Sequence, residues 1–140
     1  MGNSRVVALD GQHKFFRFRI PSSSYGDSHL FKLAAELLKP GDVVIAISTS
    51  GQLPELLAAV DAARAAGADV IAITSSKSAL AKKATVCLAV DHSEDSTSFL
   101  SMISRILQLL LIDILSVGIS LGGRETESEK KRMLISHLDI

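Results

Sequence analysis

Short apolar runs alternate with helical segments through the middle of the chain, and this alternation limits the folds that it can adopt. The runs lie at residues 43–47, 70–73 and 86–90. Between the first two, apolar side chains recur at helical spacing from Leu53 to Val60, and Ser78 is suited to cap a shorter helix before the third. Strands that alternate with helices indicate a parallel sheet, so the sequence predicts a three-layer α/β/α fold. A chain of 140 residues has room for one such domain.

The first apolar run ends in three hydroxyl residues and a glycine, directly before a predicted helix. These residues are Ser48, Thr49, Ser50 and Gly51. The N-terminus of a helix has unpaired backbone N–H groups and a favourable dipole for anions, so we expect a phosphate site here, with Thr49 using its backbone N–H. In a simpler interpretation Ser50 is only the N-cap of the helix, but a cap accounts for one hydroxyl and not three. Gln52 either donates to the ligand from the first turn or is merely exposed.

Further polar residues follow the other two apolar runs. Ser75 and Ser76 come after the second run, and His92 and Glu94 come after the third. The carboxyl ends of parallel strands share one edge of the sheet, where ligands of such folds bind, so these residues are secondary candidates. Glu55, in the first turn of the predicted helix, is stabilised there by the helix dipole in any case. The four histidines lack the spacing of metal ligands, and no metal or cofactor is expected.

The segments before the first apolar run are also predicted to form helices and a strand. We expect a helix at residues 5–17, capped by Ser4, with one face formed by Val6, Leu9, His13 and Phe16. We expect His13 to be packed or at an interface rather than catalytic. A strand is predicted at residues 18–22, interrupted by Pro21, and a helix capped by Asp27 follows it.

The stretch 99–121 is apolar enough to resemble a membrane span. It contains Arg105, Gln108 and Asp113, which are costly in hydrocarbon, so we predict an interior helix with one narrow polar stripe that is wet or faces another subunit. Residues 1–121 then form the domain. Residues 122–140 form a polar C-terminal helix or tail, in which residues 133–138 are suited to tether it to the body or to a partner.

Charge and cysteine content exclude some functions. Fifteen basic and fifteen acidic residues give a formal net charge of zero, so direct contact with nucleic acid is not expected. Cys87 lies in an apolar run and reads as a structural thiol. A single cysteine and the absence of a signal peptide in these residues fit the cytoplasm.

The loop and two further stretches resemble a known family. The motif S-x-S-G at residues 48–51 is similar to the sugar-phosphate loop of SIS (sugar isomerase) domains, and Glu55 matches a further motif position. The stretch ALDGQHKFFRFRIP at residues 8–21 resembles the effector domain of RpiR-type and HexR-like transcriptional regulators, as does ISRILQLLLIDIL at residues 103–115. The resemblance implies that the hydroxyls of Ser48 and Ser50 bind phosphate, and that Ser4 contacts the phosphate or sugar.

The resemblance also implies two parts that residues 1–140 do not contain. One is a helix-turn-helix domain, and the other is a first strand that would lie inside the sheet beside the 43–47 strand. Without that strand two inner edges would be unpaired. We therefore expect either lower stability or a gap closed by a shifted or swapped strand.

Two functions remain open. The first is a domain that binds a phosphorylated sugar or sugar acid and relays its presence to a partner or to a DNA-binding domain. The second is an aldose–ketose isomerase that uses Glu94 or Glu55 as the base. The apolar helix at 99–121 and the resemblance to SIS domains both favour a homo-oligomer, a dimer or a tetramer.

Overall fold

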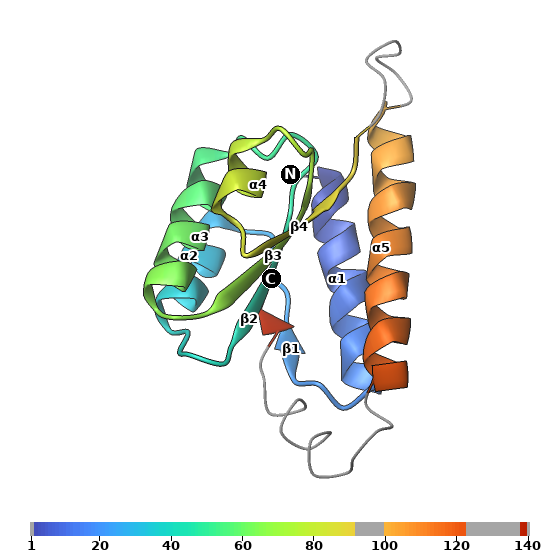
Figure 1. Cartoon of the computed structure of the whole chain (residues 1–140). Coiled ribbons are helices and arrows are strands. Elements are labelled where there is room, and N and C mark those ends of the chain that lie inside the picture. The colour runs from blue at the N-terminus through green and yellow to red at the C-terminus, as the bar shows by residue number, and fades with distance from the viewer. Residues whose placement is uncertain (1, 92–99, 123–137, 140) are drawn as a thin grey trace.

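The computed structural model describes residues 2–91, 100–122 and 138–139, and these form a three-layer α/β/α domain (Figure 1). A parallel sheet lies between two helical layers, as the alternation of strands and helices predicts. In chain order the elements are α1 (Gly2–Arg17), β1 (Ser22–Ser23), α2 (Ser28–Glu36), β2 (Val43–Ile47), α3 (Pro54–Ala65), β3 (Asp69–Thr74), α4 (Ala79–Lys83), β4 (Val86–Ala89), α5 (Leu100–Gly122) and β5 (Leu138–Asp139).

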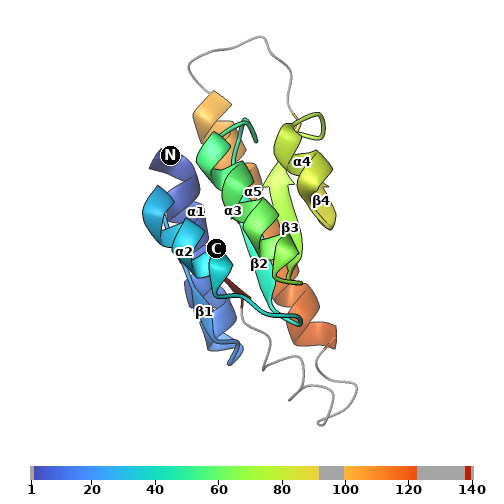
Figure 2. The same cartoon turned by 90° about the vertical axis from the view of Figure 1, so that its left-hand side faces the viewer.

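Alternate side chains of the central strands fill two separate cores. Ile45, Ile47 and Ile73 point toward the layer of α1 and α5, where they meet Phe15 and Ile112. Ala46, Val70 and Ala72 pack in the second core. The helices that cover this core are α2, α3 and α4, which lie together on one side of the sheet (Figure 2). Burial of both faces explains the continuous apolar character of β2 and β3.

The strand order is β1-β5-β2-β3-β4, and every pairing is parallel. The C-terminal residues thus lie between β1 and β2, with Leu138 opposite Ser22 on one side and opposite Val43 on the other. This is the position beside β2 in which the family resemblance implied a strand. Of the two alternatives expected from the sequence, the structure therefore shows a strand that closes the gap. The rest of the predicted C-terminal helix, residues 123–137, lies outside the described residues.

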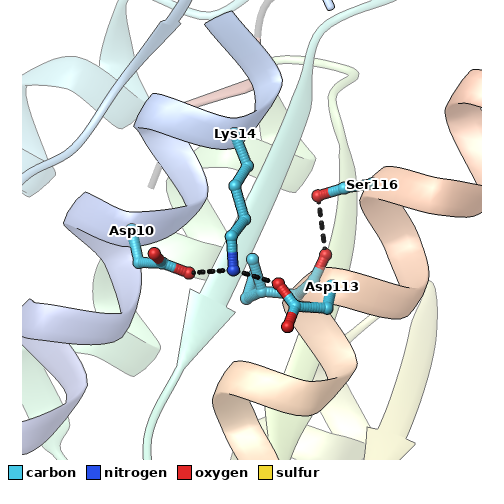
Figure 3. Close-up of polar contacts among 5 residues, drawn as sticks. Asp10, Lys14, Asp113 and Ser116 are labelled. Carbon is cyan, nitrogen blue, oxygen red and sulfur yellow. Dashed lines mark hydrogen bonds and ion pairs between the residues drawn. The ribbon is translucent and has the colours of Figure 1, made fainter. Parts of the chain in front are cut away.

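Helices α1 and α5 are joined by an ion-pair network as well as by apolar contacts (Figure 3). The ammonium Nζ of Lys14 lies 2.7 Å from an Asp10 carboxylate oxygen and also pairs with Asp113. Partial burial acts to lower the pKa of Lys14, but hydrogen bonds to Asp10 and Asp113 outweigh it and raise this pKa above 10.5. The network therefore stabilises the fold below pH 10.5, and its contribution is lost as pH rises through the raised pKa.

Part of the 8–21 stretch has a structural explanation in this packing. The Gln12 side chain accepts a hydrogen bond from the Ser24 hydroxyl at 2.7 Å, and its backbone carbonyl accepts one from Ser22 at 3.2 Å. Phe15 is completely buried and Lys14 binds α5, whereas His13 is exposed. The prediction of a packed His13 is therefore wrong within a single chain, and an interface role stays a prediction.

Three other local predictions differ from the structure. Ser4 does not cap α1, because the helix already begins at Gly2 and Ser4 lies in its first turn. The strand expected at 18–22 is displaced to Ser22–Ser23, because the backbone turns at Arg19, whose φ is +63°. The helix face with Val6, Leu9 and Phe16 is exposed, while Val7, Ala8 and Phe15 face the core.

The position of β5 gives the first prediction. Proline at residue 138 removes a backbone donor from the ladder, so Leu138→Pro should lower the free energy of unfolding by about 1–2 kcal/mol. Urea denaturation measures this change, and Asp139→Ala, which keeps the backbone donor, is the control. Equal stabilities of wild type and Leu138→Pro, together with unchanged amide exchange at Val43 and Val44, would contradict the pairing.

Candidate functional site

The segment from Ser48 to Gln52, here called the 48–52 loop, continues β2 over the edge of the sheet. The Ser48 backbone N–H still donates to the Ile73 carbonyl at 3.1 Å, so the loop begins in register with β3. The Ser48 hydroxyl then accepts the N–H of Gly51 at 3.0 Å. This hydrogen bond between two residues of the loop closes it into a tight turn.

Gly51 fixes the loop against the neighbouring elements. Its φ is +63°, in the left-handed region that favours glycine. A Cβ atom at this position would lie 2.3 Å from the Ser78 hydroxyl oxygen and 2.4 Å from the Thr74 hydroxyl oxygen. The Gly51 carbonyl also accepts the N–H of Leu80 at 3.0 Å. The backbone of Gly51 thus lies close to the side chains of Thr74 and Ser78.

Thr74 and Ser78 form a buried support below Gly51. Their hydroxyl oxygens are 3.2 Å apart, and Ser78 caps α4 by accepting the N–H of Ala81 at 3.1 Å. The cap was predicted from the sequence and is confirmed. The sequence did not predict that Thr74 and Ser78 contact the 48–52 loop, because this contact depends on how α4, which begins much further along the chain, packs against the loop.

The N-terminus of α3 is open for an anion. Its N-cap is Leu53, which makes no side-chain capping bond, and Pro54 occupies the first turn. The interpretation of Ser50 as the cap of this helix is therefore wrong. The Ser50 hydroxyl instead accepts the N–H of Gln52 at 3.4 Å, and Thr49, Ser50 and Gln52 are all exposed. The exposed residues of the loop thus lie directly before the uncapped first turn of α3, where the helix dipole favours an anion.

A carboxylate lies beside this edge, after β4. Asp91 accepts the Ser75 hydroxyl at 3.1 Å and the Ser76 backbone N–H at 2.9 Å. Hydrogen bonds from Ser76, then from Ser75, and the charge of Lys77 hold the pKa of Asp91 below its ordinary value of 3.8. The donor of Ser75 is therefore engaged with a charged group, and this residue is less available to a phosphate than the 48–52 loop.

The remaining candidates lie at several places. Ser4 is half-buried in the first turn of α1, and no hydrogen bond among the described residues joins it to the 48–52 loop. Glu55 is exposed in the first turn of α3. His92 and Glu94 lie outside the described residues. Burial, with a contribution from Asp91, raises the pKa of the Cys87 thiol, which agrees with a structural role.

A cleft of about 320 Å³ adjoins the first turns of α1, where Ser4 lies. Its lining residues come from α1, from the loop that follows β1 and from the first turn of α2: Arg5, Leu9, Gln12, Ser24, Tyr25, Gly26, Asp27 and Leu30. Strand β1 is parallel to the rest of the sheet, so this loop leaves the sheet at the same edge as the 48–52 loop. The Arg5 side chain covers Gly26, where a Cβ atom would lie 2.5 Å from the Arg5 Cδ. Sequence reasoning missed Arg5 and Tyr25, since neither belongs to a recognisable motif.

The family of the chain follows from this fold and from direct comparison. The model of the SIS domain matches residues 1–118, and the chain belongs to this family. The bifunctional protein glk of Burkholderia orbicola is 55% identical over 129 residues, which are 92% of this chain and 20% of that protein. The HTH-type transcriptional regulator HexR of Pseudomonas aeruginosa is 39% identical over 121 residues, or 86% of this chain and 42% of that regulator. The chain thus spans about a fifth of the glk protein, and the resemblance to HexR-like regulators is confirmed.

Solved structures share the fold. The Vibrio vulnificus NanR protein, complexed with ManNAc-6P, has a TM-score of 0.76 at 23% identity, covering 95% of this chain and 50% of that one. The sugar isomerase domain of an RpiR transcription factor from Sphaerobacter thermophilus has a TM-score of 0.60 at 26% identity, covering 87% and 71%. A phosphoheptose isomerase from Francisella tularensis has a TM-score of 0.65 at 24% identity, covering 83% and 70%.

The packing of Gly51 gives the second prediction. Gly51→Ala should destabilise the fold by more than about 2 kcal/mol, because the new Cβ meets Thr74 and Ser78 and the backbone is strained at positive φ. Thermal and urea denaturation measure the loss. Gly41→Ala, also at positive φ but with no atom near the new Cβ, separates strain from collision. If the two variants lose the same stability, the collision plays no part.

Proposed function

We propose that this chain is a sensor domain that binds a phosphorylated sugar or sugar acid at the 48–52 loop. The observation that carries the proposal is the open N-terminus of α3 beside the exposed Thr49 and Ser50. The phosphate accepts hydrogen bonds from the hydroxyls of Ser48 and Ser50, from the backbone N–H of Thr49 and from Gln52. Ser4, Ser75 and Glu94 are secondary candidates for the sugar.

Two similarities support this proposal. A structure with the same fold was solved in complex with ManNAc-6P, and HexR is a transcriptional regulator. In such a regulator the domain reports its ligand to an attached DNA-binding domain, and its place is the cytoplasm. Because the formal net charge of this chain is zero, the proposal assigns contact with DNA to another part of the protein.

Phosphate binding at the loop gives the third prediction. Thermal shift against a panel of sugar phosphates should find at least one that stabilises the chain. Ser50→Ala should then weaken the affinity for that compound by about 1.5–3 kcal/mol, because a charge-assisted hydrogen bond is lost. Ser120→Ala, at the C-terminal end of α5, is the matched control. No shift with any compound while the fold is intact would contradict the function, and unchanged affinity of Ser50→Ala would contradict the site.

The same panel separates a sensor from an aldose–ketose isomerase, the second candidate function. A phosphoheptose isomerase shares the fold, which favours including this alternative in the test. An isomerase would convert its ligand, and Glu94→Gln would abolish conversion while binding remained. A sensor binds the compound and returns it unchanged. Conversion by the wild type would replace the sensor proposal with the isomerase, and its loss in Glu94→Gln or in Glu55→Gln would identify the base.

We further propose that the chain forms a homo-oligomer through α5. One helix among the described residues is long and apolar enough to span a membrane, over Met102–Gly122, and 22% of its most apolar stretch is buried. In the structure this helix packs on α1 and the sheet and leaves an apolar stripe exposed. The stripe consists of Ile103, Ile106, Leu110, Ile114, Val117 and Leu121. Steps of three and four residues place all six on one side of the helix, as pairing of two such helices requires.

The stripe gives the fourth prediction. Wild type should be dimeric or larger by light scattering, and Leu110→Glu should shift it to monomer, because a charge in the centre of an apolar interface is costly. Lys32→Glu, on exposed α2, is the control and should keep the oligomer. A monomeric wild type at high concentration, in buffer without detergent, would contradict the proposal.

A further inference from the structure

The inner side of α5 has a polar residue directly below the candidate site. Four residues spaced by four face inward and are at most 5% exposed: Ser104, Gln108, Ile112 and Ser116. The Ser116 hydroxyl donates to the Ile112 carbonyl of its own helix at 2.8 Å. Gln108, by contrast, reaches away from the helix to the 48–52 loop.

Gln108 holds a residue of that loop by its side chain. Its amide Nε2 donates to the hydroxyl oxygen of Thr49 at 3.3 Å, across 59 positions of the sequence. Thr49 lies between Ser48 and Ser50, the residues proposed to bind phosphate through their hydroxyls. A buried amide of α5 therefore sets the position of the central residue of the loop.

Stability alone does not account for glutamine at this position. Gln108 is 1% exposed, and its Oε1 has no hydrogen-bond partner among the described residues. A buried oxygen without a partner costs free energy, whereas leucine would fill a similar volume at no such cost. The neighbours Leu107 and Leu109 are apolar. A residue that is unfavourable for folding and bonded to the loop fits a role in binding.

We propose that Gln108 is a positioning residue for the phosphate site. It fixes the Thr49 side chain and with it the adjacent peptide groups, so that the N–H of Thr49 and the hydroxyls of Ser48 and Ser50 face the ligand before it arrives. Without this bond the loop has to be ordered during binding, which lowers affinity. The inference rests on the proposed function, because it concerns the same loop and the same ligand.

The test compares Gln108→Leu and Thr49→Val, singly and together, with the sugar phosphate that stabilises the wild type. Gln108→Leu should unfold at the same or a higher temperature, yet bind at least about fivefold more weakly, the loss expected from one hydrogen bond. Thr49→Val should lose a similar factor. The double variant should bind no more than about twofold more weakly than either single variant, because both remove one interaction. Ser116→Ala, on the same side of α5, is the control and should bind as the wild type does.

The possible results separate a failure of this inference from a failure of the proposed function. Wild-type affinity in Gln108→Leu, or additive losses in the double variant, would overturn it while leaving the proposed function intact. If Gln108→Leu does not fold, Thr49→Val with wild-type affinity would overturn it equally. A wild type that binds no sugar phosphate removes the proposed function and this inference together.

Discussion

The backbone of Gly51 packs directly on the hydroxyls of Thr74 and Ser78, and the geometry of the candidate site depends on this contact. It brings the turn after β2 against the start of α4, where the Gly51 carbonyl is also bonded to Leu80. Any side chain at residue 51 would lift the turn away from the sheet. Because the turn is held from below by Gly51, Thr49 and Ser50 are left exposed, although the hydroxyl of Thr49 is bonded to Gln108.

The same edge of the sheet is organised by contacts from both helical layers. Gln108 of α5 reaches Thr49 from one layer, and Ser78 at the start of α4 supports Gly51 from the other. Asp91 places a negative charge next to Ser75 and Ser76, which favours phosphate binding at the 48–52 loop rather than after β3. The site is therefore a short exposed loop on a rigid base, an arrangement suited to recognising a ligand with little change of structure.

The sequence predicted those parts of the fold that depend on local pattern. The predicted caps at Asp27 and Ser78 and the alternation of β2, α3 and β3 are confirmed, because capping and periodicity are properties of neighbouring residues. The sequence could not show which apolar stripe of α1 faces the core, since Val7 and Val6 lie on different stripes of similar character. Nor could it place Leu138–Asp139 between β1 and β2, because two residues have no recognisable period and their pairing partners lie about a hundred positions away.

For the candidate site, the sequence predicted the loop but not its supports. Ser48, Thr49 and Ser50 form a recognisable motif, whereas Thr74, Ser78 and Gln108 come from three other segments and meet the loop only in the folded chain. Gln108 was expected on a polar stripe that is wet or faces another subunit, whereas the structure buries it and bonds it to Thr49 of the same chain. Supporting residues of this kind are identified only from contacts between segments that are far apart in the sequence.

The most direct test of the central claim is an NMR titration of the full chain with a stabilising sugar phosphate. The account predicts that the largest amide shifts occur at residues 48–52 and in the first turn of α3, at Glu55 and Leu56, where the donors are open. Shifts confined to the cleft around Arg5 and Tyr25, with the 48–52 loop unchanged, would contradict it.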